Sequence, residues 1–337
     1  MSQLSGRQSL RDIQSNLESQ RHKLYHLGAK PIARSTLARI NEKQPAELYE
    51  ALFYKLLGRC KNQPGKHKFR FKNPLFSLDA SAIDLSMNVF PWAAHREDTC
   101  NVKLNVGLNH ATEIPEFVAL SDGNENDMVE GRKFRFPKGS IVAFDKGYVD
   151  YQWFGNLTKQ GVSFVTRLRA KAVYRVIKRQ TVRSETGVSS DQIIQLSSKH
   201  AIERGAPRLR RIGYRDQETG KFYQFLTNNF VLSAATIAAI YKDRWKVELF
   251  FKAIKQNLKI KTFVGTSKNA VLTQVWIALI TYLLVAFARH SAKEGWSVQR
   301  MLRVLQLSLF ERRSLKEILN PDPPPNQKDQ PQMRLVL

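Results

Sequence analysis

The chain has 337 residues, of which 42% are hydrophobic and 10% aromatic, and a formal net charge of +25 at pH 7. This composition excludes an intrinsically disordered chain, and the length predicts a large core divided into about two or three lobes. The positive charge is spread along the sequence and favours a polyanionic partner. Nucleic acid is the leading candidate, and ribosome-associated proteins and anionic-membrane binders share the trait.

Cysteine usage and apolar segments place further bounds on the class of protein. Cys60 and Cys100 show no metal-ligand spacing and no disulfide framework, which fits a reducing cytoplasm. Residues 1–21 lack the apolar run of a secretory signal. The stretch from Val271 to Ala288 has about the minimum length of a membrane span, but we expect it to be a helix buried in a core. We therefore expect a cytoplasmic protein without a membrane partner.

Residues 1–60 predict a helical N-terminal lobe that binds DNA. Helices are expected within 10–27, 32–40 and 46–57, and Arg34 to Arg39 could open a recognition helix of the helix-turn-helix type. A small helical bundle with solvated charges explains the same pattern equally well. A basic connector follows, with a turn at Pro64-Gly65 and a lobe boundary within it.

The remainder of the chain predicts a mixed α/β sheet with flanking helices. Residues 68–168 form its first part, with strands expected at 75–85, 102–108, 117–120, 140–145 and 162–168 and a helix at 149–160. Residues 169–230 predict a mostly β insertion rich in Lys and Arg, with strands at 173–177, 208–214 and 222–226. A long helix and a buried helix complete the domain over 231–292, followed by C-terminal helices over 293–320 and a disordered tail over 321–337.

The long helix is predicted from the stretch Tyr241 to Leu258, with Ser233 as a candidate N-cap, because neither Gly nor Pro occurs between Ser233 and Lys261. At about 100° per residue, Tyr241, Arg244, Glu248 and Lys255 share a sector about 60° wide. An ordinary amphipathic helix with a solvated face gives the same pattern. The meaning of the sector depends on whether Glu248 has partners elsewhere in the chain.

Two aspartates supply candidate partners, because Asp79 and Asp145 each end an apolar, strand-like run. Taken singly, an Asp at a strand end is more often a cap, a turn residue or a salt-bridge partner. Together with Glu248, the two can converge into a cluster that needs divalent cations, and carboxylate oxygens suit Mg²⁺ or Mn²⁺. Two such ions support in-line displacement at a phosphodiester. Residues ranked lower, because they fall in loops, turns or mid-element, are Asp84, Asp122, Asp127, Asp150, His95 and His110.

These residues also carry a resemblance to a known family. The spacing Tyr241-x2-Arg244-x3-Glu248-x6-Lys255 resembles the Tyr-Arg-Glu-Lys signature of insertion-sequence-4 family transposases, which are DDE transposases. The segment from Leu78 to Ser81 is similar to the family's first-aspartate block. The run Asp145-Lys-Gly-Tyr148 is similar to the second, and further similar blocks are Lys103–Asn105 and Phe164–Arg167. The resemblance spans roughly residues 5–320.

The resemblance implies an RNase H-like catalytic core in which Asp79, Asp145 and Glu248 hold two Mg²⁺ ions, or Mn²⁺ ions in their place. It implies cut-and-paste transposition: water attacks the element end, the freed 3′ hydroxyl closes a hairpin, and a second hydrolysis and strand transfer follow. The implied partners are inverted-repeat ends, target DNA and a second copy of the chain in a synaptic complex. The residues implied to contact DNA are Tyr241, Arg244, Lys255, Trp245, Lys103 and Arg167.

Two alternatives to an active transposase stay open at this level. A nuclease of the same fold would cut DNA without joining it. A truncated or catalytically impaired DNA-binding remnant is the other, because Ser5 to Asp12 resembles a segment that lies well inside related proteins.

Overall fold

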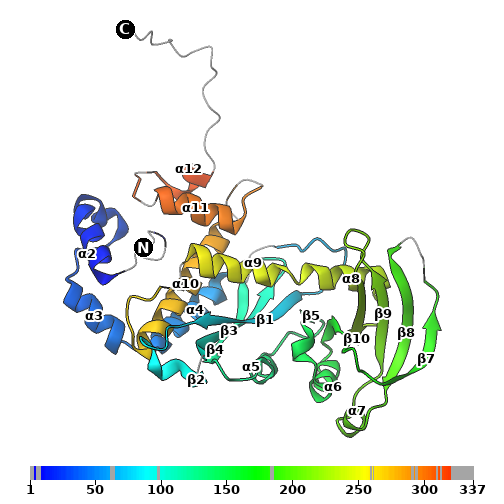
Figure 1. The fold of residues 1–337 in the computed structure, drawn as a ribbon. Coiled ribbons are helices and arrows are strands. Elements are labelled where there is room, and N and C mark those ends of the chain that lie inside the picture. Colours follow the sequence, from blue (N-terminus) through cyan, green and yellow to red (C-terminus); the bar gives the residue numbers. More distant parts are fainter. Residues whose placement is uncertain are drawn as a thin grey trace, which may run out of the picture.

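The computed structural model is built on one ten-stranded sheet with helices on both faces (Figure 1). The structure describes residues 9–60, 65–96, 99–182, 186–258, 262–289, 295–308 and 313–319, together with residues 4, 260, 292, 310 and 311. The predicted disordered tail, 321–337, lies outside these residues.

One half of the sheet has the strand order of an RNase H-like fold. β1 (Leu75–Asp84) is central and pairs antiparallel with β3 (Thr99–Asn109), which pairs antiparallel with β4 (Pro115–Asp122). On its other side β1 pairs parallel with β5 (Ile141–Phe144), and β5 pairs parallel with β6 (Ser163–Arg167). The four residues of β5 are all buried, as expected for a parallel strand covered on both faces. Short elements η2 (Pro91–Ala93) and β2 (Ala94–Arg96) precede β3.

The predicted β insertion continues this sheet. β10 (Phe222–Thr227) pairs antiparallel with β6, and β9 (Leu209–Arg215), β8 (Val188–Leu196) and β7 (Tyr174–Gln180) follow outward. Strand β8 and the short helix α7 (Lys199–Glu203) have no counterpart in the sequence prediction. In β8, Asp191 is buried by an ion pair with Arg210, so a polar residue occupies an inward position and hides the strand pattern.

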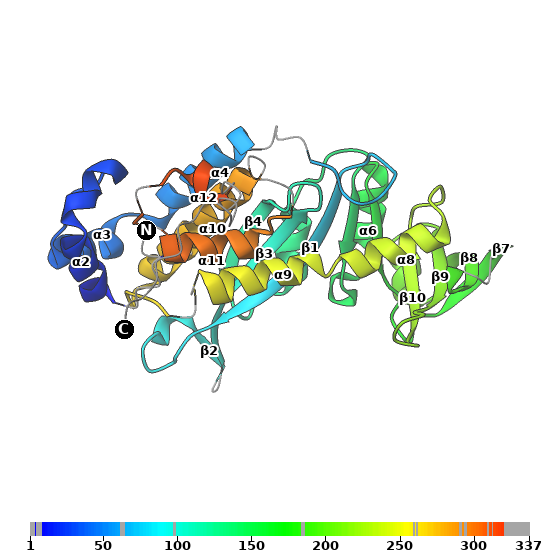
Figure 2. The same cartoon turned by 90° about the horizontal axis from the view of Figure 1, so that it is seen from above.

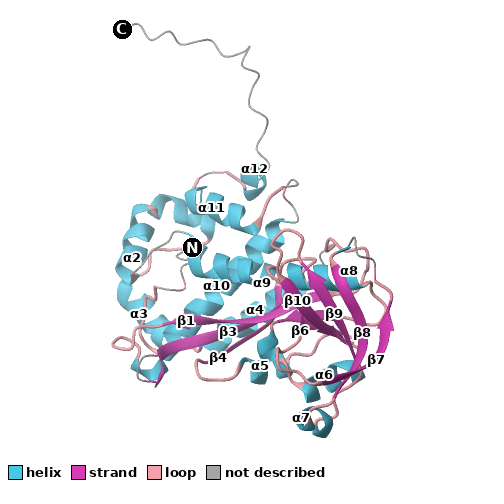
Figure 3. Ribbon diagram, turned by 45° about the vertical axis from the view of Figure 1, so that its right-hand side comes forward, coloured by secondary structure: helices cyan, strands magenta, loops and turns pink. Residues whose placement is uncertain are grey.

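Helices cover both faces of the sheet (Figures 1 and 3). α8 (Ala234–Asp243) and α9 (Lys246–Lys252) lie along one face, and α5 (Asp127–Lys133) and α6 (Tyr151–Lys159) lie against the other. The side chains of β1 point alternately to the two faces of the sheet. Phe76 and Leu78 belong to the hydrophobic cluster that includes residues of α6, whereas Ile83 belongs to the cluster that includes Val247 of α9. Asp79 therefore faces α8 and α9.

The long apolar helix α10 (Lys268–Arg289) belongs to the core, as predicted. It packs with α4 (Ala46–Cys60) and α11 (Val298–Ser308), and Phe53 of α4 lies against Trp276 with ring centroids 5.5 Å apart. The short helix α12 (Leu315–Leu319) packs against α11. Among the described helices, α10 has the length and composition of a membrane span, but 67% of that window is buried inside the fold. Such burial is typical of a core helix.

The N-terminal helices lie at the end of the molecule opposite β7 (Figure 2). They are α2 (Leu10–Ser19), the 3₁₀ turn η1 (Arg21–Leu27) and α3 (Arg34–Lys43). The side-chain amide of Asn269 on α10 donates to the carbonyl oxygens of Asn41 and Gln44 and anchors α3. α4, which the sequence places in the same lobe, packs into the main core through Phe53 and Leu57.

Candidate active site

Asp79 and Asp145 lie on neighbouring parallel strands at the same level of the sheet. Leu78 of β1 pairs with Phe144 of β5, and the residue that follows each of them in the chain is an aspartate. Asp145 follows the end of β5 and caps the 3₁₀ turn η3 (Lys146–Tyr148), because its Oδ1 accepts the Gly147 N–H at 3.0 Å. Asp79 lies in the middle of β1 instead of at its end, since the strand continues to Asp84 by pairing with β3.

The predicted long helix begins at its expected N-cap, Ser233, but it is interrupted where the site forms. Arg244 and Trp245 form a tight turn between α8 and α9, with the Arg244 N–H bonded to the Tyr241 carbonyl at 3.2 Å. The Glu248 N–H bonds to the Trp245 carbonyl at 3.0 Å, so the 3₁₀ pattern continues through the turn. Residues i and i+3 are eclipsed in such a turn, which aligns Tyr241 with Arg244. α9 then ends in a π-helical segment, η5 (Ala253–Asn257), which carries Lys255.

Two arginines join the three carboxylates. Nη1 of Arg244 lies 3.0 Å from Asp79 Oδ2, and its Nη2 lies 2.6 Å from Glu248 Oε1. Asp79 and Glu248 are therefore within reach of a single guanidinium. Arg167 of β6 pairs with Asp145, with Nη2 3.0 Å from Oδ2. β1, β5, β6 and the helix turn thus bring the predicted triad together.

The aromatic ring of Tyr241 contacts both arginines of the site, Arg167 and Arg244. Its side chain is nearly buried, and its ring centroid lies 5.7 Å from Cζ of Arg244 and 5.8 Å from Cζ of Arg167. These are cation–π distances, and the quadrupole of the ring favours both positive charges. The Tyr241 ring therefore helps to position both guanidinium groups beside the carboxylates.

The carboxylates differ in how readily they ionise. Burial raises the pKa of Asp79 to about 6, and the charges of Glu248 and Asp145 add to that rise, while Arg244 opposes it. For Asp145, burial acts upward, but the bonds from Gly147 and Arg167 outweigh it and hold its pKa below the ordinary value. At neutral pH Asp79 and Asp145 are therefore both ionised, and below a pH of about 6 Asp79 holds a proton.

A buried hydrogen-bonded chain that sequence reasoning missed anchors the helix turn to β1. Ser77 Oγ lies 2.6 Å from His110 Nε2, and His110 Nδ1 lies 2.8 Å from Asp243 Oδ2. Lys68 completes the chain at 2.7 Å from Asp243 Oδ1. Ser77 and His110 are almost fully buried, so this Ser-His-Asp order serves structure and gives a substrate no access. The hydrogen-bonded chain thereby links Asp243, which directly precedes Arg244, to Ser77, which lies two residues before Asp79.

Three other residues predicted to contact DNA lie in different surroundings. Trp245 is 59% exposed beside the site. Lys255 donates a hydrogen bond to the Ala82 carbonyl of β1. Lys103 donates to the Glu125 carbonyl at 2.6 Å and pairs with Asp127 of α5 at 2.9 Å, so it lies on the opposite face of the sheet. The DNA contact of Lys103 stays a prediction without geometric support.

The donor set fits a hard divalent cation in its chemistry. Three carboxylates converge, and oxygen ligands of this kind suit Mg²⁺ or Mn²⁺. In this arrangement guanidinium groups bond one oxygen of each carboxylate, and within the described part of the chain no three His, Cys, Asp or Glu side chains form a ready metal cluster. The carboxylates could close on an ion once Arg244 leaves one of them.

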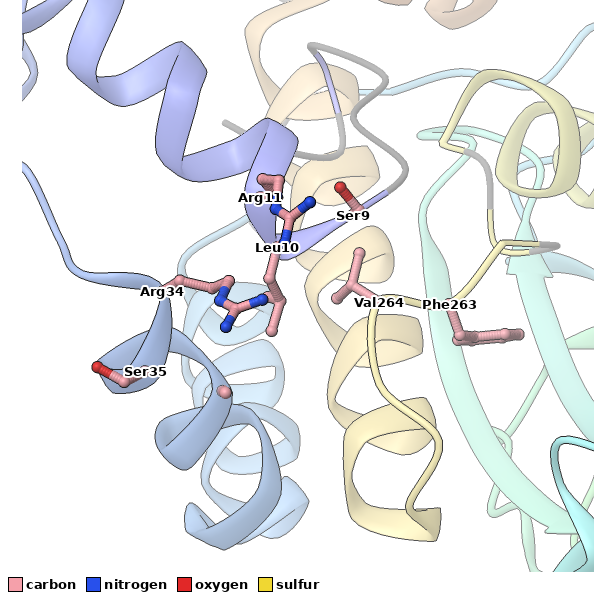
Figure 4. Close-up of a pocket in the computed structure, with 8 residues that line it drawn as sticks. Ser9, Leu10, Arg11, Arg34, Ser35, Phe263 and Val264 are labelled. Carbon is pink, nitrogen blue, oxygen red and sulfur yellow. The ribbon is translucent and has the colours of Figure 1, made fainter.

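A basic groove lies between the N-terminal helices and the segment before α10 (Figure 4). Arg11 of α2 and Arg34 of α3 point into it, opposite Phe263 and Val264, and its volume is about 480 Å³. The groove gives the N-terminal helices a positively charged surface that faces the rest of the molecule.

An RNase H-like sheet with three converging carboxylates defines a class of phosphoryl-transfer enzymes. Residues 70–284, more than half of the chain, match the family described as the transposase DDE domain, and the chain belongs to that family. It is a DDE transposase that acts on DNA. Residues 1–30 match a domain of unknown function (DUF4372).

Relatives carry names of the same kind. The chain is 30% identical over 291 residues to a protein of Sinorhizobium fredii named as the transposase y4zB, covering 85% of this chain and 80% of the relative. It is 29% identical to a protein of Geobacillus stearothermophilus named as a transposase for insertion sequence element IS5377, covering 78% and 69%. Among solved structures, a piggyBac transposase synaptic complex with hairpin DNA aligns with a TM-score of 0.45 and 12% identity, over 88% of this chain and 63% of that chain. That likeness is too distant to define function.

Proposed function

We propose that this transposase moves an insertion sequence by cut-and-paste transposition, with Asp79, Asp145 and Glu248 as its catalytic residues. It hydrolyses DNA at the element's inverted-repeat ends, closes hairpins there, reopens them and joins the freed 3′ ends to target DNA. The observation that carries the proposal is the convergence of the three carboxylates on Arg244 and Arg167. The names of the relatives support an insertion sequence as the substrate.

Mg²⁺, or Mn²⁺ in its place, would be held by the three carboxylates and would supply Lewis-acid activation of water or a hydroxyl. The ionisation of the aspartates makes them suitable ligands for a cation at neutral pH. Asp145 stays ionised well below neutral pH, and Asp79 loses its proton near pH 6. Arg244, once released from a carboxylate, is placed to bind a DNA phosphate, which is the role that the family resemblance implies for it.

The surroundings of the site offer further contacts for DNA. Trp245 gives an exposed aromatic face on which an extruded base can stack. Lys255 lies in the π-helical segment η5 that follows α9, and Arg11 and Arg34 would give the N-terminal lobe its own phosphate contacts. We propose that two copies of the chain act together in the cytoplasm, one at each end of the element.

The proposal is tested with the DNA that flanks the gene on both sides, end-labelled and incubated with Mg²⁺, Mn²⁺ or EDTA. Metal-dependent cuts at inverted repeats, with hairpin products on denaturing gels, are the expected result. Asp79→Asn, Asp145→Asn and Glu248→Gln should each reduce cutting to the level seen in EDTA. Asp84→Asn removes an exposed carboxylate from the end of β1 and serves as the matched control.

A second arm separates a transposase from the two alternatives. Supplied with pre-cleaved ends and a plasmid, the protein should join them, whereas a nuclease would only cut. Binding of the ends without any cutting, unchanged in all three variants, would instead identify a DNA-binding remnant.

A further inference from the structure

A loop that leads into β1 combines aromatic and basic side chains. We name residues 65–74 the basic loop. Within it Lys66-His-Lys-Phe-Arg-Phe-Lys72 alternates cations with rings. All four cations are exposed, and His67, Phe69 and Phe71 are half-buried. Basic grooves interleaved with aromatic rings are typical of proteins that bind single-stranded nucleic acid.

The rings of the loop form one platform. Phe69 and Phe71 stack with centroids 5.3 Å apart and planes 13° apart, and His67 lies 4.6 Å from Phe71. Phe69 and Phe71 also pack against the core cluster that contains Tyr241. The platform is therefore held from below by the elements that form the catalytic site.

The conformation of the basic loop is fixed at several points. His67 Nε2 bonds to the Asn73 carbonyl at 2.9 Å and closes the loop, and the Asn73 amide donates to the Gly139 carbonyl at 2.7 Å. Lys68 is tied to Asp243, the residue before Arg244. At Gly65 a side chain would lie 2.6 Å from the Ala111 carbonyl, so only glycine allows this close approach to the β3–β4 turn. A pre-formed loop loses little entropy when a ligand binds.

A cavity of about 490 Å³ lies between the basic loop and the β3–β4 turn. Its lining combines the three rings with the cations Lys66, Arg70 and Lys72. Among the described residues, no carboxylate pairs with any of these three cations. Their charges are available for phosphate groups, and the rings are available for a base.

We propose that this cavity binds one unpaired nucleotide of a DNA strand, with its base against the Phe69–Phe71 platform and its flanking phosphates on Arg70 and Lys72. The inference rests on the proposed function in taking DNA as the substrate. A duplex offers only phosphates here, because its bases are stacked and paired. The contact between Lys68 and Asp243 places the bound strand next to the turn that carries Arg244.

The test measures fluorescence anisotropy in EDTA, which prevents cutting, with a labelled thymidine single strand, its abasic counterpart and a duplex of equal length. The wild-type protein should bind the thymidine strand more tightly than the abasic strand by about fivefold to a hundredfold, the range that one stacked base gives. Phe71→Leu keeps the apolar packing and should abolish this preference while leaving duplex affinity within twofold.

Charge variants complete the design. Arg70→Ala combined with Lys72→Ala should weaken binding of all three probes and reduce its salt dependence. Lys159→Ala combined with Lys199→Ala removes the same charge from exposed positions on α6 and α7 and should have a smaller effect. Urea midpoints of all variants report folding, and Phe69→Leu provides a second ring variant if Phe71→Leu is unstable.

Each outcome decides the inference. A preference for bases that survives both ring variants overturns it, as does equal binding of the thymidine and abasic strands by the wild type. Free thymidine monophosphate that competes as tightly as the strand also overturns it, since the cavity would then be a mononucleotide site. If the wild type shows the Phe71-dependent preference but never cuts the flanking DNA, the loop site stands and the transposition proposal fails.

Discussion

Replacing Arg244 by Gln removes the cation that joins two of the three carboxylates, and it should destabilise the protein in the absence of divalent metal. Arg244 is 13% exposed, and its partners Asp79 and Glu248 are 22% and 31% exposed. Each charge-assisted hydrogen bond contributes about 1.5–3 kcal/mol, and partial exposure returns some of this to water. We expect the free energy of unfolding to fall by about 2–4 kcal/mol for the two bonds together.

The measurement is urea unfolding, followed by circular dichroism, in EDTA and then with Mn²⁺. Arg167→Gln is the control, because it removes a single bond at a more exposed pair and should cost only about 1 kcal/mol. Mn²⁺ should restore more stability to Arg244→Gln than to the wild type, since the carboxylates no longer have to release a guanidinium. An unfolding free energy within about 0.5 kcal/mol of the wild type in EDTA would refute this account of Arg244.

Four further predictions concern the site and the DNA-binding surface. Because the pKa of Asp79 is raised to about 6, metal-free stability should fall as the pH rises from about 4 to 6, where the unfolded chain releases a proton that the folded chain keeps. Mn²⁺ affinity, measured by calorimetry, should rise about tenfold per pH unit up to about pH 6 and then level off, and Asp79→Asn should remove that dependence. His110→Ala removes the hydrogen-bond partner of buried Ser77 and one of the partners of Asp243, which keeps Lys68, and it should cost about 2–4 kcal/mol in urea unfolding. His95→Ala, at a half-buried position, should cost less than about 1 kcal/mol. DNA affinity should fall by about 10³-fold or more between 50 and 200 mM salt, and a flat salt profile would argue against a surface with many phosphate contacts.

Sequence reasoning singled out Asp79, Asp145 and Glu248 as candidate catalytic residues because their signals are local. Asp145 follows a short apolar strand, Asp79 lies in a longer one, and Glu248 lies in a helical sector with two cations. Parallel pairing of β1 with β5 then places both aspartates at one level, as the RNase H-like expectation requires. The buried helix α10 was also predictable, because its run of apolar residues is unbroken by charge.

The features that were missed depend on contacts between distant segments. The turn at Arg244 contains neither Gly nor Pro and forms where Asp243 is held by His110 and Lys68, which are far from it in the sequence. The pairing of Arg244 with Asp79 could not be predicted either, because a helical wheel places a side chain on one face of a helix and does not identify its partner in another segment. Strand β8 was missed because its inward Asp191 is neutralised by Arg210 of β9.

The central claim is that Asp79, Asp145 and Glu248 together form one metal site, and anomalous scattering from crystals grown with Mn²⁺ tests it most directly. The account predicts Mn²⁺ peaks bounded by oxygens of all three carboxylates, with Arg244 moved away from Asp79 or Glu248. Peaks elsewhere, or a fully occupied Arg244 bridge at saturating Mn²⁺, would contradict it.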